Sequence, residues 1–171
     1  MVKKDKMVLV ISISLILIFG LVFAQQVLGN SQPEENAKFC LAQNIYFESG
    51  NQPLAGRIAV AQVTVNRMYD EQFPDNICDV VYQAKMKTNW LGDSVPIRHK
   101  CQFSWFCDGK SDIPTDSITW VQCVWLAGRV LKNYYPDITE GALWYHSNQV
   151  RPYWSKQLNR TVTIDNHLFY N

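Results

Sequence analysis

The sequence predicts a single domain of the α+β class, and three observations support that prediction. Apolar residues recur at helical spacing in three segments before residue 134, whereas short strand-like runs follow Pro136. At 171 residues and 47% hydrophobic composition, the chain has room for a targeting segment and one core, but not for two. Helices first and short strands later are typical of α+β domains, here with a helical core and a small C-terminal β region.

The N-terminus is typical of an export segment. Three lysines precede an uncharged run at residues 7–24, which ends in Val-Phe-Ala, a pattern suited to signal-peptide cleavage. The run is also nearly long enough to cross a bilayer. Residues 1–24 are therefore predicted to be a signal peptide or an N-terminal membrane anchor, residues 25–33 a linker, and residues 34–171 the folded domain. We expect an exported protein in the periplasm, cell wall or medium, or one held at the inner membrane by its N-terminal segment.

The first helix of the domain is expected to end at about Glu48. Ser31 can cap it, and Leu41, Ile45 and Glu48 fall on one face at positions i, i+4 and i+7. Gly50 is a natural stop after this face. An acid therefore closes an otherwise apolar helix face.

Two further helices carry wider apolar stripes, over residues 54–69 and 116–133. Thr115 or Asp116 is the expected N-cap of the later helix. Residues 73–83, between them, predict a turn followed by a short helical or extended piece.

The remaining segments predict loops and strands. Residues 84–100 are polar and aperiodic, which predicts a loop. Residues 101–109 alternate aromatic and polar side chains and end in Asp-Gly, which predicts a hairpin. Strands are expected at residues 141–147 and 161–170.

Five cysteines lie outside the export segment, so an oxidising compartment would allow one or two disulfides and leave one thiol. Cys101 and Cys107 could join across the predicted hairpin, although spacing alone does not choose the pairs. No H-E-x-x-H or C-x-x-C spacing is present, and we expect no metal or other cofactor. A nucleophilic pair of Cys107 and His146 is conceivable but has no local signature.

Glu48 is the candidate for acid–base chemistry. Apolar surroundings and the negative end of the helix dipole would both raise the pKa of its carboxyl group. A carboxyl that keeps its proton near neutral pH can protonate a leaving oxygen and later take a proton back. The alternative is a carboxylate that rotates into solvent at a frayed helix end, which the pattern alone favours.

Two aromatic residues with polar neighbours suggest a groove for a glycan. Trp105 lies close to Gln102 and Ser104, and Tyr145 precedes His146. Aromatic rings interleaved with amides and hydroxyls suit a neutral, elongated, polar ligand. The formal net charge of +1 gives no comparable reason to expect nucleic acid as a partner.

Several strings together resemble the SleB-type cell-wall hydrolases, a family that includes spore-cortex-lytic enzymes. The resemblance extends from Cys40 to Tyr170, and its strings occur in the family order. These strings are NIYFE, IAVAQVTVNRM, FPDNICDVVYQ, CQFSWFCDG, GALWYHS and HLFY. One departure is that relatives commonly read Glu-Ala-Arg-Gly-Glu where this chain reads Glu-Ser-Gly-Asn-Gln, so the later acid is the amide Gln52 here.

The resemblance implies a lysozyme-like, lytic-transglycosylase-related fold that cleaves the β-1,4 MurNAc-GlcNAc glycan strand of peptidoglycan. It also implies that Glu48 is the catalytic acid. The residues implied to line the groove are Gln102, Ser104, Trp105, Tyr145 and His146. We expect the glycan strand as partner, membrane contact only through the N-terminal segment, and a monomer.

Ordinary glycoside hydrolysis normally uses two carboxyl groups, and a second one is hard to identify here. Asp108 is the best remaining acid, although a turn explains it equally well. One acid suffices if the substrate's own hydroxyl attacks, which makes a lytic transglycosylase with a 1,6-anhydro product the leading hypothesis. The alternatives are an N-acetylmuramoyl-L-alanine amidase and a non-catalytic peptidoglycan-binding module.

Overall fold

The structure is a computed structural model in which residues 32–171 are described. The chain divides into two units, residues 1–36 and Ala37–Asn171. The predicted signal or anchor, most of the linker and the Ser31 cap lie outside the described residues. Among the residues that are described, no helix has the length and apolar character needed to cross a bilayer.

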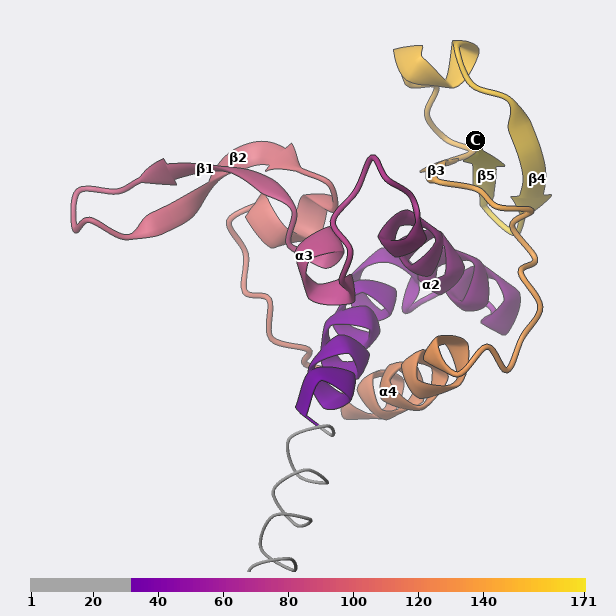
Figure 1. The fold of residues 1–171 in the computed structure, drawn as a ribbon, viewed down its shortest axis with the longest axis horizontal. Coiled ribbons are helices and arrows are strands. Elements are labelled where there is room, and N and C mark those ends of the chain that lie inside the picture. Colours follow the sequence, from indigo (N-terminus) through magenta and orange to yellow (C-terminus); the bar gives the residue numbers. More distant parts are fainter. Residues whose placement is uncertain (1–31) are drawn as a thin grey trace, which may run out of the picture. The chain divides into compact units, whose positions relative to one another are not determined.

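Four α-helices occur in the described part of the chain (Figure 1). The first, named the Glu48 helix, covers residues 32–49. It is followed by α2 (Leu54–Tyr69), α3 (Ile77–Val81) and α4 (Ser117–Leu131). The predicted helices are therefore confirmed, and the piece after the turn at residues 73–76 is helical rather than extended.

Asp116 is the N-cap of α4, one of the two expected candidates. Its side chain accepts hydrogen bonds from the backbone N–H groups of Ile118 and Thr119. The hydroxyl of Tyr46 accepts the N–H groups of Thr115 and Asp116 at 3.1 and 2.9 Å. This contact ties the start of α4 to the last turn of the Glu48 helix.

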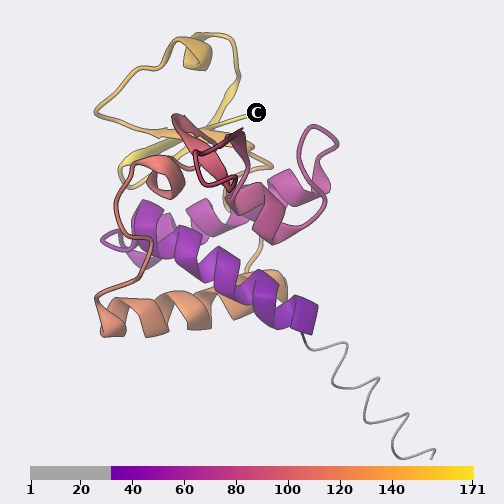
Figure 2. The same cartoon turned by 90° about the vertical axis from the view of Figure 1, so that its left-hand side faces the viewer.

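The main core lies among these helices. In Figure 2, α4 runs along the Glu48 helix on the side away from the C-terminal strands. Leu41 and Ile45 of the Glu48 helix are fully buried in one cluster with Leu126 of α4 and Val80 of α3. The apolar faces of these helices therefore pack against one another, as expected for helices whose apolar residues recur at helical spacing.

Two disulfides are present, and Cys123 is the remaining thiol in a buried position. Burial raises the pKa of Cys123 to about 11, so the thiol stays protonated and unreactive. The expectation of one or two bridges with one thiol left over is confirmed. The suggested bridge between Cys101 and Cys107 is one of the two.

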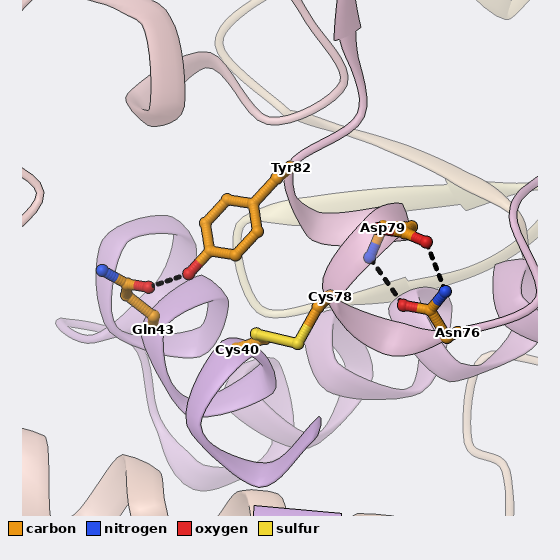
Figure 3. Close-up of a disulfide and its surroundings, with 6 residues drawn as sticks. All are labelled: Cys40, Gln43, Asn76, Cys78, Asp79 and Tyr82. Carbon is orange, nitrogen blue, oxygen red and sulfur yellow. Dashed lines mark hydrogen bonds between the residues drawn. A yellow bond between two sulfur atoms is a disulfide. The ribbon is translucent and has the colours of Figure 1, made fainter. Parts of the chain in front are cut away.

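The other disulfide joins Cys40 of the Glu48 helix to Cys78 of α3 (Figure 3). Close to it, the hydroxyl of Tyr82 donates a hydrogen bond to the side-chain oxygen of Gln43. The bridge and this hydrogen bond hold α3 and the residue after it against the Glu48 helix.

A two-stranded hairpin replaces the loop predicted over residues 84–100, so that prediction is wrong. Strand β1 (Ala84–Thr88) pairs with β2 (Ser94–Cys101) in antiparallel fashion. Most of its side chains are exposed, and hydrophobic alternation appears only when one sheet face is buried. At the turn, the Asn89 side chain accepts the N–H groups of Leu91 and Asp93, both at 2.9 Å.

The hairpin predicted over residues 101–109 is also wrong. The segment instead forms the 3₁₀ helix η1 (Ser104–Cys107), which the Cys101–Cys107 disulfide closes into a short loop. The Asp-Gly pair turns the chain here too, with Gly109 at a positive φ of 86°. The Asp-Gly pair therefore does form a turn, but this turn follows the 3₁₀ helix and does not join two strands.

The C-terminal strands form one antiparallel sheet in the order β3-β5-β4. Their bounds are Trp144–Ser147 for β3, Arg160–Ile164 for β4 and His167–Tyr170 for β5. The expected strand at residues 161–170 is thus two strands joined by a tight turn, in which Asp165 has a φ of 50°. The small C-terminal β region is confirmed, and so is the α+β class.

The two faces of this sheet have different neighbours. Tyr145 and its strand partner Phe169 lie on the inner face, where Phe169 packs against Ala59 and Val63 of α2. His146 lies on the outer face, because successive residues of a strand point in opposite directions.

Candidate active site

Glu48 lies in the last turn of the Glu48 helix, and the chain around it is tightly built. The Ser49 hydroxyl donates to the Ile45 carbonyl at 3.1 Å, and the Gly50 N–H donates to the Tyr46 carbonyl at 3.1 Å. A Cβ at Gly50 would collide with the Tyr46 carbonyl oxygen, so only glycine allows this close exit from the helix. The helix end is therefore ordered by hydrogen bonds, and Glu48 is partly buried within it.

Tyr145 is the direct partner of Glu48. Its hydroxyl donates a hydrogen bond to a Glu48 carboxyl oxygen at 2.9 Å, across 97 residues of sequence. Burial, followed by the negative charge of Glu48, raises the pKa of Tyr145 well above its ordinary value. The hydroxyl therefore stays protonated and remains a donor to the acid.

Arg67 of α2 is a buried cation near both groups, with only 4% of its surface exposed. Its Nε donates to the Leu143 carbonyl at 2.7 Å, and the guanidinium lies 5.2 Å from the Phe73 ring centre and 5.0 Å from that of Phe103. One of its terminal nitrogens, Nη1, is buried without a hydrogen-bond partner. Within residues 32–171, the charge is thus held by ring contacts and one carbonyl rather than by an ion pair.

The pKa of Glu48 lies above its ordinary value. Burial is the largest cause, because removing water disfavours the carboxylate. The hydrogen bond from Tyr145 and the positive charge of Arg67 act in the opposite direction and limit the rise. Glu48 is thus a carboxyl that keeps its proton more readily than a surface acid and has two groups ready to stabilise its anion.

Glu48 opens into a pocket of about 330 Å³. One wall is aromatic: the rings of Phe47 and Trp105 stack with centroids 4.8 Å apart. Trp105 is mostly buried, and its indole N–H donates to the Asn44 side chain at 3.0 Å. Ser104 also lines the pocket and is exposed.

The wall formed by the remaining lining residues is acidic and polar. It contains Asp108, Lys110, Ser111 and Asp112. Asp108 accepts the Lys110 N–H at 2.8 Å and lies 3.7 Å from the ammonium of the same residue. Burial, and then the charge of Asp108, raise the pKa of Asp112. Gln43 donates to the Asp112 carbonyl at 2.8 Å, which connects this wall to the hydrogen bond from Tyr82 described above.

The predicted site residues fall into three groups. Glu48, Ser104 and Trp105 line the pocket, and Tyr145 contacts it through Glu48. Gln102 is exposed but does not line the pocket.

His146 faces away from Glu48, on the outer face of the sheet. Its Nδ1 lies 2.8 Å from the Ser147 carbonyl, which can only accept, so Nδ1 donates to it, and Nε2 forms a hydrogen bond of 2.9 Å with the Tyr170 hydroxyl. Both ring nitrogens are therefore occupied. The conceivable pair of Cys107 and His146 is excluded as a nucleophile, because Cys107 is in a disulfide.

Sequence reasoning missed several residues of this site. Phe47 could have been found, since it directly precedes Glu48 in the NIYFE string. Arg67 follows Val60 and Val63 at helical spacing, and a cation that continues this apolar stripe is a usable signal. Asp112 has no local pattern that points to it. No group of three or more potential metal-ligating His, Cys, Asp or Glu residues gathers within residues 32–171.

Comparisons with known proteins identify relatives of this chain. The family model described as Cell Wall Hydrolase matches residues 51–170 and so begins just after Glu48. The spore cortex-lytic enzyme of Halalkalibacterium halodurans is 40% identical over 43 residues, which cover 25% of this chain and 13% of that relative. The chain therefore matches only a small part of the length of this curated relative.

Two solved structures share the fold. The catalytic domain of the germination-specific lytic transglycosylase SleB from Bacillus anthracis aligns with a TM-score of 0.58 and 23% identity, over 80% of this chain and 94% of that one. The catalytic domain of Bacillus cereus SleB aligns with a TM-score of 0.56 and 22% identity, over 80% and 91%. The predicted lysozyme-like α+β fold is thereby confirmed, and the chain belongs to the cell wall hydrolase family.

Proposed function

We propose that this protein cleaves the glycan strand of peptidoglycan at the β-1,4 bond between MurNAc and GlcNAc, with Glu48 as the proton donor. The observation that carries this proposal is that the partly buried Glu48 lines a pocket and accepts a hydrogen bond from Tyr145. Two likenesses support it: the fold is similar to that of a protein titled lytic transglycosylase SleB, and a stretch of 43 residues is 40% identical to a spore cortex-lytic enzyme.

In the first step, Glu48 gives its proton to the bridging oxygen as the bond from that oxygen to C1 of the muramyl residue breaks. The raised pKa keeps the proton available for this transfer. The carboxylate left behind accepts the Tyr145 hydrogen bond and lies in the field of the Arg67 guanidinium. Both groups therefore stabilise the anion that the transfer creates.

In the second step, the C6 hydroxyl of the same muramyl residue attacks C1 and gives its proton to the Glu48 carboxylate. A 1,6-anhydro ring forms, Glu48 regains its proton, and no water is consumed. One other acid of the pocket, Asp108, is engaged with Lys110 and so is less available as the second carboxylate that hydrolysis normally uses.

The remaining predictions form part of the same proposal. Residues 34–171 are the catalytic domain, and residues 1–24 export it as a cleaved signal or retain it as an anchor. The two disulfides fit an oxidising compartment outside the cytoplasm. The protein acts as a monomer on its polymer and needs no cofactor.

Product analysis tests this proposal. Purified full-length protein is incubated with sacculi, and the released muropeptides are analysed by mass spectrometry with and without borohydride reduction. We expect 1,6-anhydro ends, which borohydride leaves unchanged. Reducible muramyl ends would contradict the transglycosylase mechanism but keep glycan cleavage, whereas free stem peptides without cut glycan would point to an amidase.

A further inference from the structure

A second pocket, of about 330 Å³, lies on the outer face of the C-terminal sheet. Its lining includes His146 of β3 and Tyr170 of β5, whose rings stack with centroids 5.2 Å apart. This pair is held rigid by its mutual hydrogen bond and by Trp154 of η2 (Tyr153–Lys156), which packs against both rings. Part of the pocket lining is therefore an aromatic pair held in place by its neighbours, and this pocket shares no lining residue with the Glu48 pocket.

Three cations line this outer pocket: Arg151, Lys156 and Arg160. They come from a loop, from η2 and from β4, and all three are exposed. Within residues 32–171 none of them makes an ion pair. The only acidic side chain of residues 141–171 is Asp165, which lies against Gly56 of α2. The lining of the pocket therefore contains three cationic side chains and no acidic one.

An irregularity in the sheet brings one of these cations to the pocket. Along β4 and β5, Arg160 pairs with Tyr170 and Thr163 pairs with Leu168, so β4 has one extra residue between the two pairs. Val162 and Ile164 pack on the inner face with Phe169. Without the bulge, strict alternation would put Arg160 on that inner face as well. The bulge places it on the outer face instead.

The rest of the lining suits a peptide better than a bare phosphate. Val150 and Leu168 add apolar side chains to the lining, which a methyl group of a ligand could contact. The Ser155 hydroxyl already donates to the Pro152 carbonyl at 2.8 Å, so toward a ligand it can only accept, for example from an amide N–H. Peptidoglycan stem peptides carry carboxylates, alanine methyl groups and amide N–H groups, whereas phosphate has only the charge.

We propose that the outer pocket binds the carboxylates of peptidoglycan stem peptides through Arg151, Lys156 and Arg160. This inference rests on the proposed function, because it takes the sacculus as the substrate. Arg guanidinium groups match carboxylates with paired N–H donors. The pocket holds a stem of the sacculus on one face of the sheet, while Glu48 acts on glycan at the other.

Calorimetric titration of the full-length protein with the tripeptide L-Ala-γ-D-Glu-meso-diaminopimelate tests this inference. The matched ligand is the same tripeptide with its carboxylates converted to amides. We expect the charged tripeptide to bind and the amidated one to bind at least about tenfold more weakly, since hydrogen bonds between charged groups are lost. Equal binding of the two ligands would overturn the inference.

Variants locate the binding. Arg151→Gln and Arg160→Gln should each weaken tripeptide binding by about tenfold or more. Lys132→Gln, which removes an exposed cation at the end of α4, should leave it unchanged. Arg160→Lys keeps the charge without the paired donors, so a thermally stable protein with partial binding supports the geometry. Binding that is unchanged in both glutamine variants would overturn the inference.

Two further experiments are needed. The first distinguishes a peptide carboxylate from a polymer phosphate as the anion in the outer pocket, and the second tests the outer-pocket inference and the proposed function independently. Poly(glycerol phosphate) is used as a competitor of the tripeptide. If it displaces the tripeptide at a phosphate concentration lower than the carboxylate concentration at which the tripeptide binds, the pocket binds a phosphate polymer and the stem-peptide inference is wrong. Cleavage of glycan chains stripped of stems reports only on Glu48. Cleavage without tripeptide binding defeats the pocket inference alone, and tripeptide binding without cleavage defeats the proposed function alone.

Discussion

The inner and outer faces of the C-terminal sheet use the same kind of hydrogen bond for different purposes. On the inner face, the Tyr145 hydroxyl donates a hydrogen bond to Glu48, which belongs to a helix outside the sheet. On the outer face, the Tyr170 hydroxyl bonds to His146 of the neighbouring strand. The first bond crosses from sheet to helix and acts on an ionisable acid, and the second stays within the sheet and supports a pocket. Adjacent residues of one strand can therefore serve separate sites.

The largest expected effect comes from the inner face, in Glu48→Gln. An amide has the same shape but no transferable proton, so we expect glycan turnover to fall by about 100- to 10,000-fold. Loss of sacculus turbidity measures the turnover, and circular dichroism verifies that the fold is retained. Glu71→Gln, at an exposed acid, is the matched control and should behave like the unaltered protein. Normal turnover in Glu48→Gln would remove this residue from the mechanism.

Tyr145→Phe is expected to have the next largest effect. It removes a hydrogen bond to a charged group, which is worth about 1.5–3 kcal/mol, so turnover should fall by roughly tenfold or more. Because that hydrogen bond lowers the pKa of Glu48, its loss raises the pKa further. Rate measurements against pH should therefore show the fall in activity at alkaline pH displaced to higher pH. A displacement to lower pH would be inconsistent with the proposed role of Tyr145.

Arg67→Met tests the same face at longer range. Methionine can keep the contacts with the Phe73 and Phe103 rings but carries no charge. Since the Arg67 charge lowers the pKa of Glu48, the alkaline limb of the pH profile should again move upward, with a loss of turnover below about tenfold. A pH profile that stays in place, in a variant that is folded by thermal denaturation, would show that Arg67 is only structural.

The smallest effect on turnover is expected from the outer face, in Tyr170→Phe. The variant loses the hydrogen bond to His146, at a cost of about 1 kcal/mol in the free energy of unfolding. Denaturant unfolding measures that cost, and the turnover assay used for Tyr145→Phe provides the comparison. If Tyr170→Phe lowered turnover as much as Tyr145→Phe, the separation of the two faces would not hold.

Helices and strands could be predicted from the sequence where a segment buries only one of its faces, because its apolar residues then recur at a regular spacing. The helices and C-terminal strands do so, and their apolar periodicity predicted them. The hairpin of β1 and β2 exposes most of its side chains, and Trp90 at its tip is 91% exposed, so no alternation was available to predict its strands. The irregular register of this ladder depends on contacts between the two strands that a local pattern does not contain.

The candidate site divides in a similar way. Glu48 could be singled out because an acid on an apolar face is a local signal. The face of the sheet on which His146 lies could not be predicted. Alternation along a strand puts the side chains of Tyr145 and His146 on opposite faces, but it does not say which of the two faces the Glu48 helix. Arg160 was beyond prediction for another reason, since its position depends on a bulge in a ladder between two strands.

The most direct test of a proton-holding Glu48 is to titrate its carboxyl group. Carbon-13 NMR of glutamate-labelled protein, with the Glu48 signal assigned by its loss in Glu48→Gln, follows the ionisation of this one group with pH. We expect a midpoint above the ordinary glutamate value of about 4.3, and a further rise in Tyr145→Phe. A midpoint at or below the ordinary value would contradict the proposal that Glu48 is a proton donor held by burial.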